Sequence, residues 1–147
     1  MVANALDQQI REAPASGRQP LQVQAYANYS RLVGLLGSTR DELAASKNAQ
    51  IAVSRLAYYA AELGKAEEAA KWLDQLLQVR PKDRRYLQRA AQAHVQARQD
   101  AQALQHLRTL LAGLPAGSAD WYEAKYYQLE ALSRTNVEQA KKVFRQF

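Results

Sequence analysis

Residues 53–81, VSRLAYYAAELGKAEEAAKWLDQLLQVRP, and residues 87–115, LQRAAQAHVQARQDAQALQHLRTLLAGLP, are two copies of one pattern, offset by 34 positions. The places that match are Leu56-Ala57, Ala69, Leu73, Leu76-Leu77 and Pro81 in the first copy, and Ala90-Ala91, Ala103, Leu107, Leu110-Leu111 and Pro115 in the second. A fixed period of this size indicates an array of helix pairs, in which each pair buries its apolar face against the next.

A third, looser copy follows after a three-residue insertion, with Ala124, Tyr127-Gln128, Ala131, Ala140 and Phe144 at the matching places. Over residues 50–147 the pattern resembles the tetratricopeptide repeat (TPR) family. The resemblance implies an all-α array of antiparallel helix pairs, a right-handed α-solenoid, whose activity is to bind another protein rather than to catalyse a reaction. The first two helices of the chain do not match the repeat, so we interpret them as an N-terminal cap or as a degenerate repeat.

The expected organisation is one helical-repeat domain over residues 1–147. Its parts are cap helices 1–37, a lead-in 38–49, repeat one 50–83, repeat two 84–117 and a truncated third repeat 118–147.

Composition supports a helical chain. Of the 147 residues 28 are alanine, the strongest helix former, whereas six glycines and four prolines interrupt the sequence. The breaker spacing predicts seven to nine helices and about 65–75% helix. There are no cysteines, and no apolar run reaches the roughly 20 residues that span a bilayer. The location stays open; the cytoplasm is favoured because no signal peptide or membrane segment is apparent.

The N-terminal third gives four local predictions. Residues 2–13 form a short helix with Val2, Leu6 and Ile10 on one face, and residues 14–20, PASGRQP, form a loop. A second helix runs over residues 21–36 and ends at Gly37. Residues 39–63 lack Gly and Pro, so they form either one long helix or two, and a break near residues 46–48 is slightly preferred.

Helix caps are expected at four places. Ser38 with Asp41 approaches a capping box, and Asp83, Asp100 and Asn136 each precede a predicted helix. The helices that follow are expected at residues 65–79, 84–98, 100–113, 121–134 and 137–147.

Catalytic and metal-binding motifs are not recognisable. His94 and His106, the two histidines, are 12 residues apart and neither has a second ligand at the spacing of a His-Glu-x-x-His motif. His94 falls on the packing face, which favours a hydrogen-bonded core histidine. We therefore expect no catalytic residue, no metal site, no cofactor and no enzymatic activity.

In the TPR family the first helix of each pair lines a concave groove that holds a peptide or a partner helix. The resemblance places these residues in that groove: Arg55, Tyr58, Arg85, Gln88, Arg89, Gln92, Tyr122, Lys125 and Tyr126. The net charge is +6, and arginine binds carboxylates through two parallel hydrogen bonds, so an acidic peptide or helix is the expected partner. Arg55, Arg85 and Arg89 are expected to converge on one groove. The competing interpretation is a solvated basic face without a ligand.

Residues 80–89, RPKDRRYLQR, suggest nucleic acid as the alternative partner. Five basic side chains stand against one acidic one there, and Tyr86 could stack on a base. Nucleic-acid binding remains the less favoured hypothesis because no recognised nucleic-acid motif accompanies the basic stretch.

The third pair stops before its turn proline. In residues 137–147 we expect Ala140 and Phe144 to face the preceding helix, and Val143 and Phe147 to form an uncovered apolar face. Such a face predicts either further repeats or self-association through Val143 and Phe147.

Overall fold

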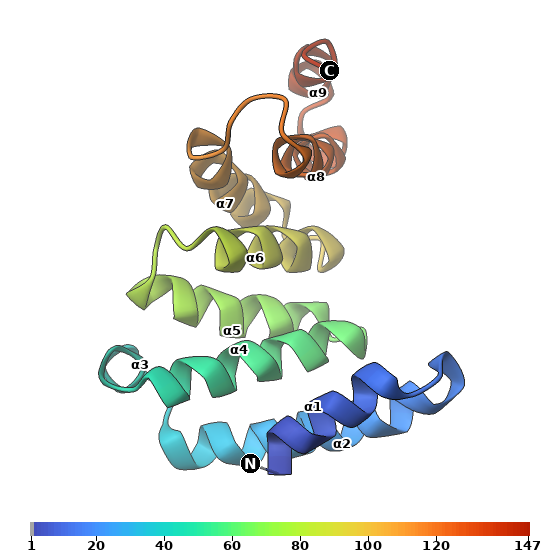
Figure 1. The fold of residues 1–147 in the computed structure, drawn as a ribbon. Coiled ribbons are helices and arrows are strands. Elements are labelled where there is room, and N and C mark those ends of the chain that lie inside the picture. The colour runs from blue at the N-terminus through green and yellow to red at the C-terminus, as the bar shows by residue number, and fades with distance from the viewer. Residues whose placement is uncertain (1) are drawn as a thin grey trace. The chain divides into compact units, whose positions relative to one another are not determined.

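The computed structural model describes the backbone of residues 2–147 and the side chains of residues 4–147. All regular structure in this range is helical (Figure 1). The helices are α1 (Val2–Glu12), α2 (Ala15–Leu36), α3 (Arg40–Ala45), α4 (Lys47–Glu62), α5 (Ala66–Val79), α6 (Arg84–Gln96), α7 (Asp100–Ala112), α8 (Ala119–Thr135) and α9 (Val137–Phe144). Nine helices over the described residues confirm the predicted all-α class and helix number, but 82% helix exceeds the predicted fraction.

The chain divides into two compact units, which we describe separately. Unit 1 is Met1–Val79 and contains α1 to α5, and unit 2 is Arg80–Phe147 and contains α6 to α9. In unit 1, α2 contacts both α1 and α4, and α4 pairs with α5. In unit 2, α6 pairs with α7, α7 contacts α8, and α8 pairs with α9. The helix pairs predicted from the 34-residue period are therefore α4–α5, α6–α7 and α8–α9.

A buried carboxylate joins three helices of unit 1. Asp7 on α1 is only 4% exposed, and its Oδ2 accepts a 2.8 Å hydrogen bond from the Tyr29 hydroxyl on α2. Its Oδ1 accepts a hydrogen bond from the Tyr59 hydroxyl on α4, and Arg55 Nε lies 3.6 Å from Oδ2. The rings of Tyr29 and Tyr59 stack with centroids 5.9 Å apart. This cluster fixes α1 on α2 and α4. Leu6 and Ile10, which were predicted to share one face of this helix, are both buried, and the side chain of Val2 lies outside the described residues.

The predicted loop at residues 14–20 is wrong, because α2 already begins at Ala15. Pro14 precedes the first turn and Pro20 lies inside the helix. Pro20 lacks an N–H, so it cannot bond back to the carbonyl of Ser16. Both residues are exposed, and water can hydrate that carbonyl. The C-terminal end of α2 is as predicted, with Gly37 at φ 86°.

Residues 39–63 form two helices, which confirms the slightly preferred alternative. Ser46 ends α3 in extended geometry, and its side chain accepts a hydrogen bond from the backbone N–H of Ala49 at the start of α4. The capping box before α3 is shifted by one residue from the prediction. Thr39 accepts from the Glu42 backbone, and the Glu42 carboxylate accepts from the Thr39 N–H, so Thr39 and Glu42 replace Ser38 and Asp41.

One arginine links three helices of unit 2 around a small core of Val95, Ala103 and Ala131. The Arg134 guanidinium on α8 donates to both carboxylate oxygens of Asp100 and to the Val95 carbonyl at the end of α6. This pairing lowers the pKa of Asp100. The predicted cap role of Asp100 is wrong, because Asp100 is the first residue of α7 and pairs with Arg134. The N-cap position is held by Gln99, whose side chain makes no capping hydrogen bond. Asp83 and Asn136 cap α6 and α9 as predicted.

None of the described helices is long and apolar enough to cross a membrane.

The Asp7 cluster generates a stability prediction. Asp7→Ala should lower the free energy of unfolding by about 2–4 kcal/mol, because two buried tyrosine hydroxyls lose their acceptor. Asp41→Ala, which removes an exposed carboxylate from the first turn of α3, should cost less than about 1 kcal/mol. Urea unfolding of both variants at neutral pH makes the comparison, and equal effects would show that Asp7 is not a structural centre.

Alkaline pH should weaken unit 1. Burial and the hydrogen bonds to Asp7 raise the pKa of Tyr29 and Tyr59, and the hydrogen bond to Glu68 raises the pKa of Tyr26 to about 12. Folding therefore favours the neutral hydroxyls, so their contribution is complete below about pH 10 and is lost as the pH rises through the folded values. We expect the urea midpoint to begin to fall near pH 10 and to keep falling up to about pH 12. Tyr29→Phe with Tyr59→Phe should flatten this fall, and an unchanged slope would contradict the assignment.

Candidate partner-binding surface

Helix α6 is amphipathic, with one buried face and one face that is exposed or partly buried. Leu87, Ala90 and Ala91 are buried. The predicted groove residues of this helix occupy the other side at three- and four-residue steps: Arg85, Gln88, Arg89 and Gln92. Arg85 is exposed, and the other three are partly buried. Asp83 begins the helix by accepting hydrogen bonds from the backbone N–H groups of Arg85 and Tyr86, so the position of Arg85 is fixed by the cap.

A side-chain hydrogen bond joins α6 to α8. Gln88 Nε2 donates to Glu123 Oε2 at 2.6 Å, and the two helices are also in contact along their backbones. Glu123 stands between the predicted groove residues Tyr122 and Tyr126 in the sequence of α8. The structure therefore places Gln88 beside α8, the helix that carries Tyr122 and Tyr126, through an acidic side chain that the sequence analysis did not single out.

The two predicted tyrosines of α8 remain available to solvent. Tyr122 is 46% exposed and Tyr126 is 61% exposed. The Tyr126 ring stands edge-on to Tyr127, which packs on the core of unit 2. Tyr122 lies in a cluster with Trp121 and Phe147, with ring centroids 5.1 and 5.9 Å from its own. We call Arg85, Gln88, Arg89, Gln92, Tyr122, Glu123 and Tyr126 the α6–α8 surface.

Lys125 is held by the end of α9 rather than offered to a ligand. Its Nζ donates to Gln146 Oε1 at 2.8 Å and lies 5.2 Å from the centroid of the Trp121 ring. Burial lowers the pKa of this ammonium group. Of the predicted cationic side chains in unit 2, Arg85 is exposed, whereas Lys125 is partly buried.

Arg55 and Tyr58 belong to unit 1 and have local roles there. Arg55 lies beside the buried carboxylate of Asp7, where it supplies the opposing charge. Tyr58 is 42% exposed and stands edge-on to Tyr59, with ring centroids 5.1 Å apart.

The basic stretch at residues 80–89 makes several contacts within unit 2. Arg80 lies 3.4 Å from Asp83 and 5.8 Å from the centroid of Tyr86, the residue proposed to stack on a base. Arg84 donates to the carbonyl of Gly113 at 2.9 Å. Two of the five basic side chains thus hold the turn and the start of α6, which weakens the case for a phosphate-binding stripe.

The predicted orientation of α9 is wrong. Val143 is 3% exposed and belongs to the interior of unit 2, whereas Phe144 is 68% exposed. Val143 is therefore buried where Phe144 was predicted to be, and Phe144 is exposed where Val143 was predicted to be. Val143 cannot contribute to a self-association face. Phe147 is 51% exposed but already contacts Trp121 and Tyr122. Phe144 instead lines an apolar hollow of about 330 Å³ with Leu129, Val137 and Ala140.

Comparison with known proteins supports the fold. No family model and no curated protein matches the sequence. Among solved structures the chain is similar to a protein of Podosopora anserina that is described as a kinesin light chain with nearly identical TPR-like repeats. The match has a TM-score of 0.58 and 16% sequence identity, and covers 98% of this chain and 82% of the other. The chain therefore has a TPR-like helical-repeat fold.

Val143 and Phe144 provide a matched test of the corrected orientation. Val143→Glu should destabilise unit 2 by about 2 kcal/mol or more, because it buries a carboxylate without a partner. Phe144→Glu should change stability by less than about 0.5 kcal/mol, since that side chain is exposed. Urea unfolding followed by far-UV circular dichroism compares the two, and the reverse order of effects would restore the original orientation.

Proposed function

We propose that this chain is a non-enzymatic protein–protein interaction module that binds an acidic peptide or helix on the α6–α8 surface. The observation that supports it most is the juxtaposition of an arginine-bearing stripe on α6 with exposed tyrosines on α8, joined by the Gln88–Glu123 hydrogen bond. The TPR-like fold is compatible with this role, because stacked helix pairs form extended surfaces suited to binding.

The chemistry of the surface favours carboxylates beside apolar groups. Arg85 and Arg89 are four residues apart, so they lie on one face of the helix, about 6 Å from each other along its axis. Each guanidinium can bind a carboxylate through two hydrogen bonds. Tyrosine adds contact area at a low cost in side-chain entropy and is enriched at binding hot spots. A partner with acidic residues one helical turn apart, followed by an apolar side chain, would match these groups.

Glu123 sets the selectivity of this surface. Its carboxylate accepts the hydrogen bond from Gln88, so it places negative charge beside the α6 stripe that carries Arg85 and Arg89. A uniformly acidic strand would be repelled here, whereas a peptide that alternates acidic and neutral positions would not. The same feature disfavours a nucleic-acid backbone, whose charge is continuous.

Charge reversal tests the surface. We expect Arg85→Glu with Arg89→Glu to weaken binding of an acidic peptide by about 2 kcal/mol or more, about 30-fold in dissociation constant. The probe is a peptide selected for binding to the folded chain from a library whose variable positions contain Asp, Glu, Leu or Phe. The selected peptide carries a fluorescent label, and fluorescence anisotropy measures its affinity. Tyr126→Ala should also weaken the complex while leaving the melting temperature nearly unchanged.

The matched control changes the same amount of charge elsewhere in unit 2. Arg108→Glu with Lys142→Glu alters exposed side chains on α7 and α9 and should leave the affinity within about threefold. Equal losses in both double variants would mean that only the net charge matters. Tighter binding of a random single-stranded oligonucleotide than of any selected peptide, with a steep salt dependence, would replace the proposal by the nucleic-acid alternative.

A further inference from the structure

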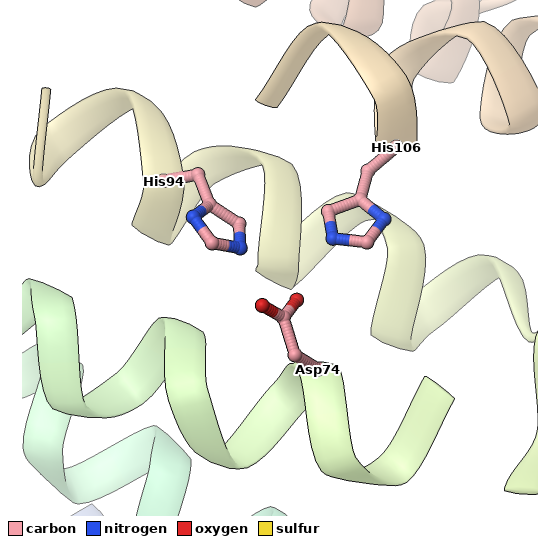
Figure 2. Close-up of side chains that lie close together, drawn as sticks. All are labelled: Asp74, His94 and His106. Atoms are coloured by element: carbon pink, nitrogen blue, oxygen red, sulfur yellow. The ribbon is translucent and has the colours of Figure 1, made fainter. Parts of the chain in front are cut away.

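The two histidines of the chain meet in unit 2 although they are 12 residues apart. His94 lies on α6 and His106 on α7, and their ring centroids are 5.3 Å apart with planes inclined by 32°. Figure 2 shows that each ring turns a nitrogen-bearing edge toward the space between the two rings. A ring nitrogen of one lies within 4.8 Å of a ring nitrogen of the other. Asp74, also labelled there, belongs to unit 1, whereas both histidines belong to unit 2.

Gln99 orients the first of these imidazoles. Its Oε1 lies 2.7 Å from His94 Nδ1. When Nδ1 donates to this amide oxygen, Nε2 is the ring nitrogen that can bind a metal ion. Gln99 stands at the N-cap position of α7, yet its side chain is used on His94 rather than on the helix. A histidine that binds a metal commonly donates its other ring N–H to an oxygen acceptor in this way.

Burial places the two rings differently with respect to solvent. His94 is 3% exposed, as its position on the packing face predicted, whereas His106 is partly exposed. An ion could therefore reach the pair from the side of His106, and the buried ring would provide a pre-positioned ligand.

We propose that His94 and His106 form a binding site for a divalent transition-metal ion, with Zn²⁺ as its representative. Imidazole nitrogen suits Zn²⁺, Ni²⁺ and Cu²⁺, and it is a poor ligand for Mg²⁺ and Ca²⁺. In a tetrahedral zinc site two ligand nitrogens are about 3.3 Å apart, so a modest rotation of His106 completes the geometry. Other oxygen ligands, including water, fill the remaining positions. The bound ion crosslinks α6 to α7.

This inference reverses the expectation of no metal site, which considered ligand spacing along a single helix. The antiparallel return of the chain at residues 97–99 brings the two rings together across a helix pair instead. The inference is independent of the proposed peptide surface.

Titration of the tag-free full chain with ZnCl₂ tests the site. The sequence holds two histidines and no cysteine, so the attribution of imidazole binding is direct. After treatment with a chelator, isothermal titration calorimetry should show one Zn²⁺ per chain, and MgCl₂ should give no saturable binding. Saturating Zn²⁺ should raise the melting temperature, because the ion binds the folded state. In NMR spectra the Cε1–H signals of both imidazoles should shift together.

Variants separate the site from adventitious binding. His106→Gln should weaken Zn²⁺ binding at least tenfold and remove the rise in melting temperature. Circular dichroism checks that this substitution of a partly exposed residue leaves the fold intact. Glu138→Gln with Asp120→Asn, which removes exposed carboxylates, should change neither measurement. The proposal is overturned by the absence of saturable binding up to about 100 µM Zn²⁺, by unchanged affinity in His106→Gln, or by a shift of only one imidazole signal.

Discussion

Close contact between helices at alanine is the constraint on which this structure depends. Ala57 and Ala69 in unit 1, and Ala91 and Ala103 in unit 2, are completely buried at matching places of the two repeats. Small side chains let helix axes approach to the lower end of the usual 8–10 Å, and a larger residue there would force the helices apart. Because alanine fills little volume, each unit adds polar contacts between helices, such as Asp7 with two tyrosines and Arg134 with Asp100.

These polar contacts also determine which charges remain for recognition. Arg55 is beside Asp7, Arg84 binds the Gly113 carbonyl, and Arg134 binds Asp100. The net charge of +6 is therefore not a measure of the surface that a partner meets. The α6–α8 surface keeps an exposed arginine and exposed tyrosines, with Glu123 among them. Its selectivity rests on this mixture rather than on an excess of positive charge.

The repeat period was sufficient to predict the helix pairs. Each helix has one apolar stripe and each turn has a helix-breaking residue, so the approximate helix ends and the pairing of neighbouring helices both follow from the sequence. It could not predict features that depend on a single residue's surroundings. Pro20 is tolerated inside α2 because the carbonyl it leaves unbonded is at an exposed position. Val143 and Phe144 are neighbours and point about 100° apart around α9. A prediction that rotates the helix by one residue therefore exchanges which of the two is buried. The histidine pair joins two helices, and a motif search along one helix has no signal for it.

The central claim is that a partner binds across α6 and α8, and mapping by NMR tests it most directly. Backbone amide shifts of the isotope-labelled chain would be followed during titration with the selected acidic peptide. The account predicts the largest changes at residues 85–92 and 122–126, with little change on the exposed side of α7. Changes concentrated in α2 and α3, or distributed evenly over both units, would contradict it.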